Sequence, residues 1–146
     1  MNLFGMLDVS GSALQAERER AEVVASNLAN AETTRTAEGG PYRRREVVFT
    51  TRPAVTQNFA GTLATVADVA VQGVRVERVV TDPTPPVRRY EPSHQDADAE
   101  GYVSYPAINP IEEMVDLMGA ARAYQLNVAA VQSTKAMIVQ SLQILS

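Results

Sequence analysis

The sequence has no cysteine and only one histidine, His94, and these two gaps exclude several kinds of site. Without thiols the chain forms no disulfide, no thiolate zinc site and no cysteine nucleophile, and a lone histidine rules out any site that needs two imidazoles from one chain. Aromatic residues are also few, with 3 Phe and 5 Tyr. Even so, 45% of the 146 residues are apolar and 21% are charged, which is average globular usage, so we expect a single folded domain with some core.

Long apolar runs and an excess of basic residues are missing as well. Thirteen Lys and Arg stand against 17 Asp and Glu, for a net charge of −4, and no segment forms the clustered basic footprint of a nucleic-acid binder. No run approaches the roughly 18 apolar residues of a membrane-spanning helix, and residues 1–11 lack the pattern of a secretory signal peptide. We therefore expect no nucleic-acid partner, and a route without a cleaved signal peptide if the protein is exported.

Proline is absent from both ends of the chain. All 8 prolines lie between Pro41 and Pro110, so a proline-rich middle separates two proline-free segments that are free to form long helices. We expect a helix over residues 2–30. Its apolar row follows steps of four and three: Leu3, Leu7, Ser10, Leu14, Glu17, Ala21, Val24 and Leu28.

A stronger pattern marks the end of the chain and predicts a helix from Pro110 to about Leu145, on the order of 50 Å long. Asn109 is expected to cap it, with Pro110 in the first turn and Glu112 at the capping-box position. Only one of ten heptad positions is polar: Met114, Leu117, Ala121, Tyr124, Val128, Val131, Lys135, Ile138, Leu142 and Leu145. Since Lys135 is also the only charge in residues 123–146, one partner helix cannot cover this surface, and neighbouring subunits must cover the rest.

The middle of the chain predicts short strands. Residues 46–51, 66–71 and 74–80 are rich in β-branched side chains and are bounded by glycine and proline, and residues 102–106 suit an edge strand. Residues 82–87, with three prolines, must be extended.

No residue pattern in the sequence supports catalysis or a bound metal or cofactor. Asp96, Asp98 and Glu100 resemble the first half of an EF-hand loop, but Ala107 stands where the bidentate glutamate should be, so a polar turn is favoured. His94 beside Asp96 is expected to be a solvated loop histidine, although a small metal-dependent enzyme built on these four residues stays open as a remote alternative.

Two polar groups keep alternatives open. Arg43-Arg44-Arg45 either hold an acidic partner or form a solvated strand edge, and we favour the second. Asn30 is expected to cap the C-terminal end of the first helix. Asn27, one turn earlier, is either solvated or hydrogen-bonded to a neighbouring chain.

Four segments resemble a known family, the flagellar axial proteins that build rod, hook and junction. The N-terminal signature is Ala25-Ser-Asn-Leu-Ala-Asn-Ala-Glu-Thr-Thr34, and residues 39–49, 101–118 and 121–127 look like the proximal-rod members. The short middle argues against the longer hook and distal-rod types. Gln95, Ala107 and the long stretch 51–68 depart from the expected pattern.

The resemblance implies an α+β fold, in which long N- and C-terminal helices form an antiparallel coiled coil that lines a channel, with a small β-rich middle domain outside it. The implied domains are residues 1–34 and 109–146 for the coiled-coil core and 35–108 for the middle. It further implies a structural subunit of the basal-body proximal rod, without catalytic residues or a small-molecule substrate, which polymerises into a torque-transmitting helical tube that crosses the periplasm. The subunit would be made in the cytoplasm and exported by the flagellar type III apparatus.

The implied partners are copies of this chain, other proximal-rod subunits, the distal-rod protein and the adaptor that joins rod to membrane ring. The alternatives are another flagellar rod subunit, or a helical-hairpin adaptor or chaperone whose termini pair stably within one molecule. The residues expected at the subunit interface are Leu7, Leu14, Asn27, Leu28, Asn30, Met114, Leu117, Tyr124, Val128, Val131, Ile138, Leu142 and Leu145.

Overall fold

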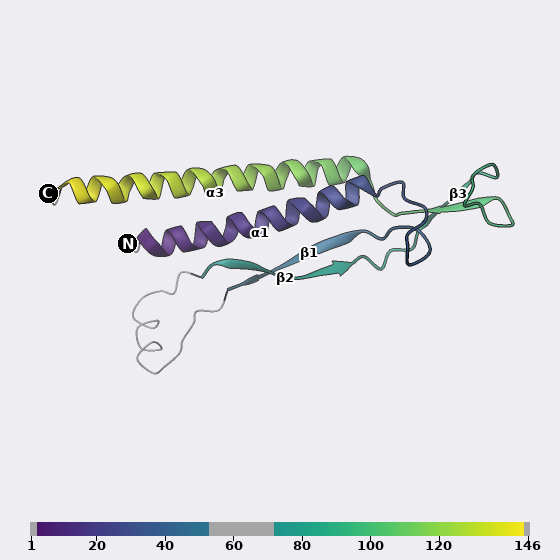
Figure 1. Cartoon of the computed structure of the whole chain (residues 1–146), viewed down its shortest axis with the longest axis horizontal. Coiled ribbons are helices and arrows are strands. Elements are labelled where there is room, and N and C mark those ends of the chain that lie inside the picture. Colours follow the sequence, from purple (N-terminus) through teal and green to yellow (C-terminus); the bar gives the residue numbers. More distant parts are fainter. Residues whose placement is uncertain (1–2, 53–71, 145–146) are drawn as a thin grey trace, which may run out of the picture.

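The computed structural model describes residues 3–52 and 72–144, and within them two long helices lie side by side along the molecule (Figure 1). Helix α1 spans Leu3–Ala29 and helix α3 spans Pro110–Ile144. They run antiparallel, so the start of α1 and the end of α3 lie at the same end of the pair (Figure 1). The expected strand at 66–71, most of the stretch 51–68, and Leu145 lie outside the described residues.

Both predicted helices are confirmed, and so are the caps that bound them. At the start of α3 the Asn109 Oδ1 accepts a hydrogen bond from the Ile111 N–H at 3.1 Å, which satisfies one of the free amides of the first turn. At the end of α1 the Asn30 Nδ2 donates to the Ser26 carbonyl at 2.9 Å. Asn30 therefore caps with its side chain, and its backbone is not left-handed.

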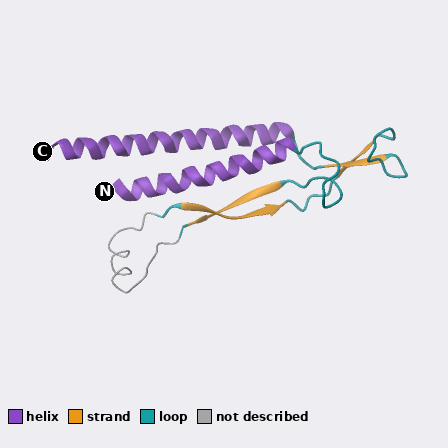
Figure 2. Cartoon of the chain, in the orientation of Figure 1, coloured by secondary structure: helices purple, strands orange, loops and turns teal. Residues whose placement is uncertain are grey.

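Two strands form a ribbon that packs along α1 (Figure 2). Strand β1, Arg45–Thr51, pairs antiparallel with strand β2, Val74–Thr81, with a bulge between Val48 and Phe49. The predictions of 46–51 and 74–80 as strands are thus confirmed. Because a two-stranded ribbon is marginal alone, its contact with α1 is what supports it.

A second antiparallel pair forms a hairpin beyond the end where α1 stops and α3 starts (Figures 1 and 2). Strand β4, Tyr102–Tyr105, confirms the predicted edge strand, and its partner is strand β3, Val87–Tyr90. Strand β3 is not predicted by the sequence pattern, in which the expected extended segment ends at Val87. Val103 on β4 is almost fully buried, whereas all four residues of β3 are exposed.

The described part of the chain has an α+β architecture with a thin core. Its buried apolar residues are Ala16, Val24, Tyr42, Val103 and Ala120. Polar residues are buried beside them, namely Asn27, Glu113 and Thr134. Neither described helix has an apolar stretch suited to crossing a membrane.

Candidate functional site: a buried polar junction and an exposed helix face

Asn27 lies where α1, the start of β1 and the start of α3 meet, and its side chain is fully buried. The Asn27 Nδ2 donates to the Arg45 carbonyl at 2.8 Å and to the Glu113 Oε2 at 3.0 Å. The Asn27 Oδ1 accepts from the Arg45 N–H at 2.9 Å and from the Tyr42 hydroxyl at 3.2 Å. The expectation that Asn27 faces solvent or a neighbouring chain is therefore wrong, because its donors and its acceptor are satisfied within the chain.

Glu113, in the first turn of α3, is the charged member of this cluster and is only 1% exposed. Its Oε1 accepts a hydrogen bond from the Arg44 Nε at 2.6 Å. Burial alone lowers the pKa of the Arg44 guanidinium, but the bond to Glu113 and the charges of Glu113 and Glu46 raise that pKa above its ordinary value. A buried carboxylate is thus compensated by a cation and an amide, as its desolvation requires. We call Asn27, Tyr42, Arg44 and Glu113 the polar junction.

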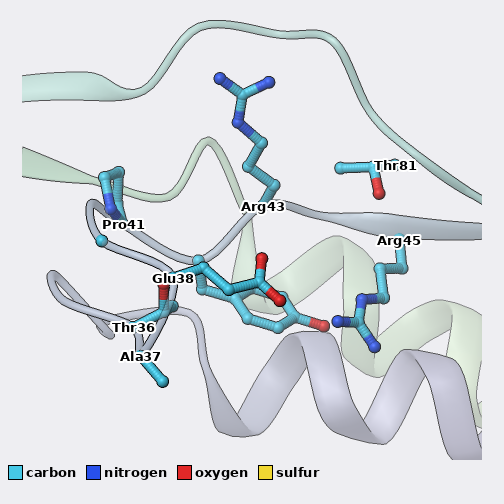
Figure 3. Close-up of a pocket in the computed structure, with 9 residues that line it drawn as sticks. Thr36, Ala37, Glu38, Pro41, Arg43, Arg45 and Thr81 are labelled. Carbon is cyan, nitrogen blue, oxygen red and sulfur yellow. The ribbon is translucent and has the colours of Figure 1, made fainter.

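The three consecutive arginines do not act as a unit. Arg44 turns inward to Glu113 and also pairs with Glu46, so the expectation of a solvated strand edge is wrong for this residue. Arg43 is exposed, while the Arg45 guanidinium packs over the Tyr42 ring, 5.6 Å from its centroid. Figure 3 shows the Arg43 side chain leading away from the helix and the Arg45 side chain leading toward it, beside a hollow of about 320 Å³.

One row of α3 faces α1, and its members are spaced by seven residues. Glu113, Ala120 and Thr134 are buried and Asn127 is half-buried, and we call these four residues the inner row. The Thr134 hydroxyl and the Asn127 amide donate to carbonyls one turn back in α3, at 2.9 Å each. The inner row thus brings small or internally satisfied side chains toward α1. Of the more apolar row predicted from the sequence, Met114, Ala121 and Val128 lie one residue to the side, whereas Leu117, Val131 and Ile138 lie one turn after inner-row residues and are half-buried.

The rest of α3 leaves large apolar side chains uncovered in this chain. At its start Ile111 is 72% exposed and Met118 is 64% exposed, and near its end Leu142 is 62% exposed. Phe4 of α1 is 74% exposed. The other exposed large apolar residues of the two helices are Met6, Met114, Val115, Tyr124, Leu126, Met137 and Val139. We call the exposed large apolar residues of α3 the outer face: Ile111, Met114, Val115, Met118, Tyr124, Leu126, Met137, Val139 and Leu142.

The predicted interface residues are distributed over both sides of the helices. Among them Met114, Tyr124 and Leu142 are exposed, and Asn27 is buried in the polar junction. The half-buried ones are Leu7, Leu14, Leu28, Asn30, Leu117, Val128, Val131 and Ile138.

The acidic loop of the β3–β4 hairpin serves as a polar turn, as predicted. The Asp98 Oδ1 accepts hydrogen bonds from the Glu100 and Tyr102 N–H groups, at 3.0 and 2.8 Å, and its Oδ2 accepts from the Arg88 Nη2. The bond from the Tyr102 amide does most to hold the pKa of Asp98 below its ordinary value. Within residues 3–52 and 72–144 there is no group of three or more His, Cys, Asp or Glu placed to hold a metal ion.

The sequence pattern does not predict that Glu113 is buried or that Ile111 and Met118 are exposed. The available signal was the spacing of Glu113, Ala120, Asn127 and Thr134, a heptad row of small and polar residues beside the apolar one.

Comparison with known proteins identifies the family. Residues 7–35 match the model of the flagella basal body rod protein family, and residues 99–144 match that of the flagellar basal body rod FlgEFG protein C-terminal family. The first match covers most of α1 and the second covers β4 and α3. Both elements that meet at the polar junction from the two ends of the chain thus lie in matched regions.

Relatives are similar along nearly their whole length and carry one name, flagellar basal-body rod protein FlgC. The protein of Bacillus subtilis is 39% identical over 148 residues, and that of Borreliella burgdorferi is 38% identical over 150 residues, each covering 99% of both chains. The Escherichia coli O157:H7 protein is 38% identical over 142 residues, covering 97% of both chains. These relatives are rod proteins by name, and none is named as an enzyme. The chain therefore belongs to the FlgC family of flagellar basal-body rod proteins and is a structural subunit of the rod.

Proposed function

We propose that the chain is a proximal-rod subunit whose helices α1 and α3 form an antiparallel coiled coil at the wall of a tube, with neighbouring subunits packed on the outer face. The exposure of large apolar side chains along α3 and at Phe4 is the observation that carries this proposal. Contiguous apolar surface of this kind is characteristic of interaction sites. The heptad spacing of the inner row supports coiled-coil packing between the two helices.

Assembly is coupled to folding in this proposal. The free chain buries too few apolar side chains along α1 and α3 to offset the entropy of ordering them, so its ends are partly disordered and suit passage through the export apparatus. Neighbouring helices then supply the missing burial. A head-to-tail contact whose rotation does not close yields a helical tube, so the next protein rather than symmetry limits copy number.

The remaining assignments rest on family membership. We propose residues 1–34 and 109–146 as the core domain and 35–108 as the middle domain. Other proximal-rod subunits, the distal-rod protein, the ring adaptor and the flagellar export apparatus are the proposed partners. The interface residues are those named from the sequence, without Asn27 and with Ile111 and Met118 added.

Leu142→Asp tests the interface. Leu142 is largely exposed, so a carboxylate there disturbs this chain's own packing little but places a charge in a desolvated contact between subunits. We expect loss of rod incorporation and of motility in soft agar, with normal amounts of the chain outside the cytoplasm. The matched control Leu142→Met keeps the apolar surface and should assemble. Normal rods with Leu142→Asp would overturn the proposed interface.

A further inference from the structure

Helix α3 has a repeating pattern that leaves its register against α1 poorly defined by apolar contacts alone. The inner row recurs every seven residues, and the apolar positions Met114, Ala121 and Val128 beside it recur at the same interval. A slide of one heptad therefore again places apolar side chains at the heights of Met114 and Ala121, and brings Lys135 only to the height of Val128. Something other than apolar packing must distinguish the registers.

We infer that the polar junction selects the register, and that Asn27, Arg44 and Glu113 are positioning residues of the subunit. Glu113 differs from the other three members of its row because it carries a charge, and it meets the Asn27 amide and the Arg44 guanidinium at 3.0 and 2.6 Å. Arg44 reaches it from the segment just before β1, which Asn27 fixes through the Arg45 backbone. Glu113 is thereby held from two parts of the chain, α1 and the segment before β1.

A slide by seven residues in either direction breaks this arrangement. In one direction Ala120 replaces Glu113 opposite Asn27, and Glu113 moves beyond the end of α1 at Ala29. In the other direction Asn27 faces position 106, which precedes the start of α3. Each slide leaves the buried Asn27 amide without the carboxylate that it now binds. Such penalties are how a single buried polar residue fixes the register of paired helices.

The consequence concerns assembly and rests on the proposed function. Every copy in a polymer must present the same outer face at the same height, and the register of α3 against α1 sets the position of Ile111 and Leu142 relative to Phe4. A subunit one heptad out of register would displace its outer face by about 10 Å, at 1.5 Å per residue. The polar junction thus makes the subunits geometrically identical.

Cysteine cross-linking in the full chain tests this inference, since the natural sequence has no cysteine. With Asn27 opposite Glu113, the antiparallel helices place Ala13 opposite Asn127, fourteen residues along each helix. One-heptad slides place Ala13 opposite Ala120 or Thr134 instead. Ala13→Cys is therefore combined in turn with Asn127→Cys, Ala120→Cys or Thr134→Cys. Rods isolated from cells making each variant are oxidised, and disulfides within one chain are scored by non-reducing electrophoresis and peptide mapping.

With the native junction we expect the disulfide between positions 13 and 127 to dominate. The double variant Asn27→Leu with Glu113→Leu places apolar side chains at both positions and removes the polar selection. The off-register fraction should then rise on the order of ten-fold, equivalent to about 1.4 kcal/mol of lost discrimination. Thr134→Leu also replaces a buried polar residue of the inner row but lies outside the junction. Thr134→Leu is combined with the cysteine pairs at positions 13 and 127 and at positions 13 and 120. It should leave the ratio of these two disulfides unchanged.

An unchanged pattern in the double variant, or mixed registers with the native junction, would overturn the inference. If the double variant does not enter rods, the same disulfides are scored in rods that contain Glu113→Leu alone, a milder change. Failure of the proposed interface is seen separately. It appears as normal assembly of Leu142→Asp, whereas the cross-links report the register within one copy.

Discussion

Asn27 makes four hydrogen bonds with three residues, and no other side-chain type of its size supplies them all. Its amide nitrogen binds Glu113 and the Arg45 carbonyl, and its oxygen binds Tyr42 and the Arg45 amide. Aspartate has the right shape but only accepts, and a second carboxylate beside Glu113 would be strongly unfavourable. Leucine fills the space and leaves the backbone of Arg45 without partners.

Asn27→Ala should destabilise the folded subunit by roughly 2–4 kcal/mol. The substitution removes one hydrogen bond to the buried Glu113 carboxylate and the bonds to the Arg45 carbonyl and N–H. Asn30→Ala, the same change three residues later, removes the half-buried cap and should cost about 1 kcal/mol. The urea midpoint for release of the chain from isolated basal bodies measures both. Equal effects of the two substitutions would show that the junction adds nothing beyond an ordinary cap.

Local sequence patterns predict the roles of the capping residues better than those of the buried polar residues. Asn109 and Asn30 act within one turn of their own position, so local spacing is enough to predict them. Asn27 and Glu113 are 86 positions apart and are satisfied only once α1 and α3 are paired in one register. No local pattern contains that information.

Among the elements, α1 and the ribbon are held together by a contact at the start of β2. The Ser12 hydroxyl accepts a hydrogen bond from the Val74 N–H at 3.0 Å and donates to the Val9 carbonyl at 2.7 Å. Gly73 lies against it, and a Cβ built on that glycine would come within 2.5 Å of the Ser12 Oγ. The absence of a side chain at position 73 is therefore what allows the ribbon to approach the helix.

Gly73→Ala should displace Ser12, break its bond to Val74 and loosen the ribbon, at a cost of about 1–3 kcal/mol. Gly11→Ala is the matched control. A Cβ at Gly11 meets nothing within 4 Å, and alanine should stabilise α1 by about 1 kcal/mol. Protease susceptibility of β2 in assembled rods reports the difference. Equal protection of β2 in both variants would refute the contact.

The β3–β4 hairpin should depend on pH through Asp98, whose pKa is lowered by its bonds to the Tyr102 amide and to Arg88. A lowered folded pKa means that the ionised form stabilises the hairpin. This contribution is present above the ordinary value of 3.8 and is lost as the pH falls through the lower folded pKa. The amide proton shift of Tyr102 should therefore titrate below pH 3.8, and Asp98→Asn should abolish the titration. A Tyr102 shift that titrates equally in Asp98→Asn would assign it to another group.

Element boundaries followed from the sequence wherever one pattern dominated. Proline and asparagine marked the start of α3, and β-branched runs marked β1 and β2. Strand β3 escaped because Arg88 and Arg89 break any apolar alternation, and only pairing with β4 makes these residues a strand. The face that α3 turns to α1 was also unpredictable from local sequence, because large apolar side chains lie on several sides of this helix.

At the scale of the whole molecule, long helices are combined with very little core. Figure 1 shows helices α1 and α3 side by side, with a thin two-stranded ribbon along α1. The buried apolar side chains are few and mostly small. Burial at about 25 cal/mol per Å² cannot hold helices of 27 and 35 residues firmly on this basis. We propose that the polar junction specifies how they pair and that neighbouring subunits supply the stability.

Hydrogen exchange distinguishes this proposal from the helical-hairpin adaptor. In the free chain, amides of α1 and α3 should exchange rapidly. Strands β1 and β2 should follow, since their ribbon packs on α1. In assembled rods the same amides should be protected by several orders of magnitude, because opening a helix there exposes apolar surface of two subunits.

The comparison needs a chain that is free but otherwise native. If Leu142→Asp blocks assembly, this variant provides the free chain at high concentration. The wild-type chain at low concentration shows whether the substitution itself changes the exchange rates. Strong protection of α1 and α3 in the free chain would mean that one molecule satisfies its own helices. In that case the exposed outer face would serve a client or partner rather than the folding of the subunit, and assembly would dock preformed parts.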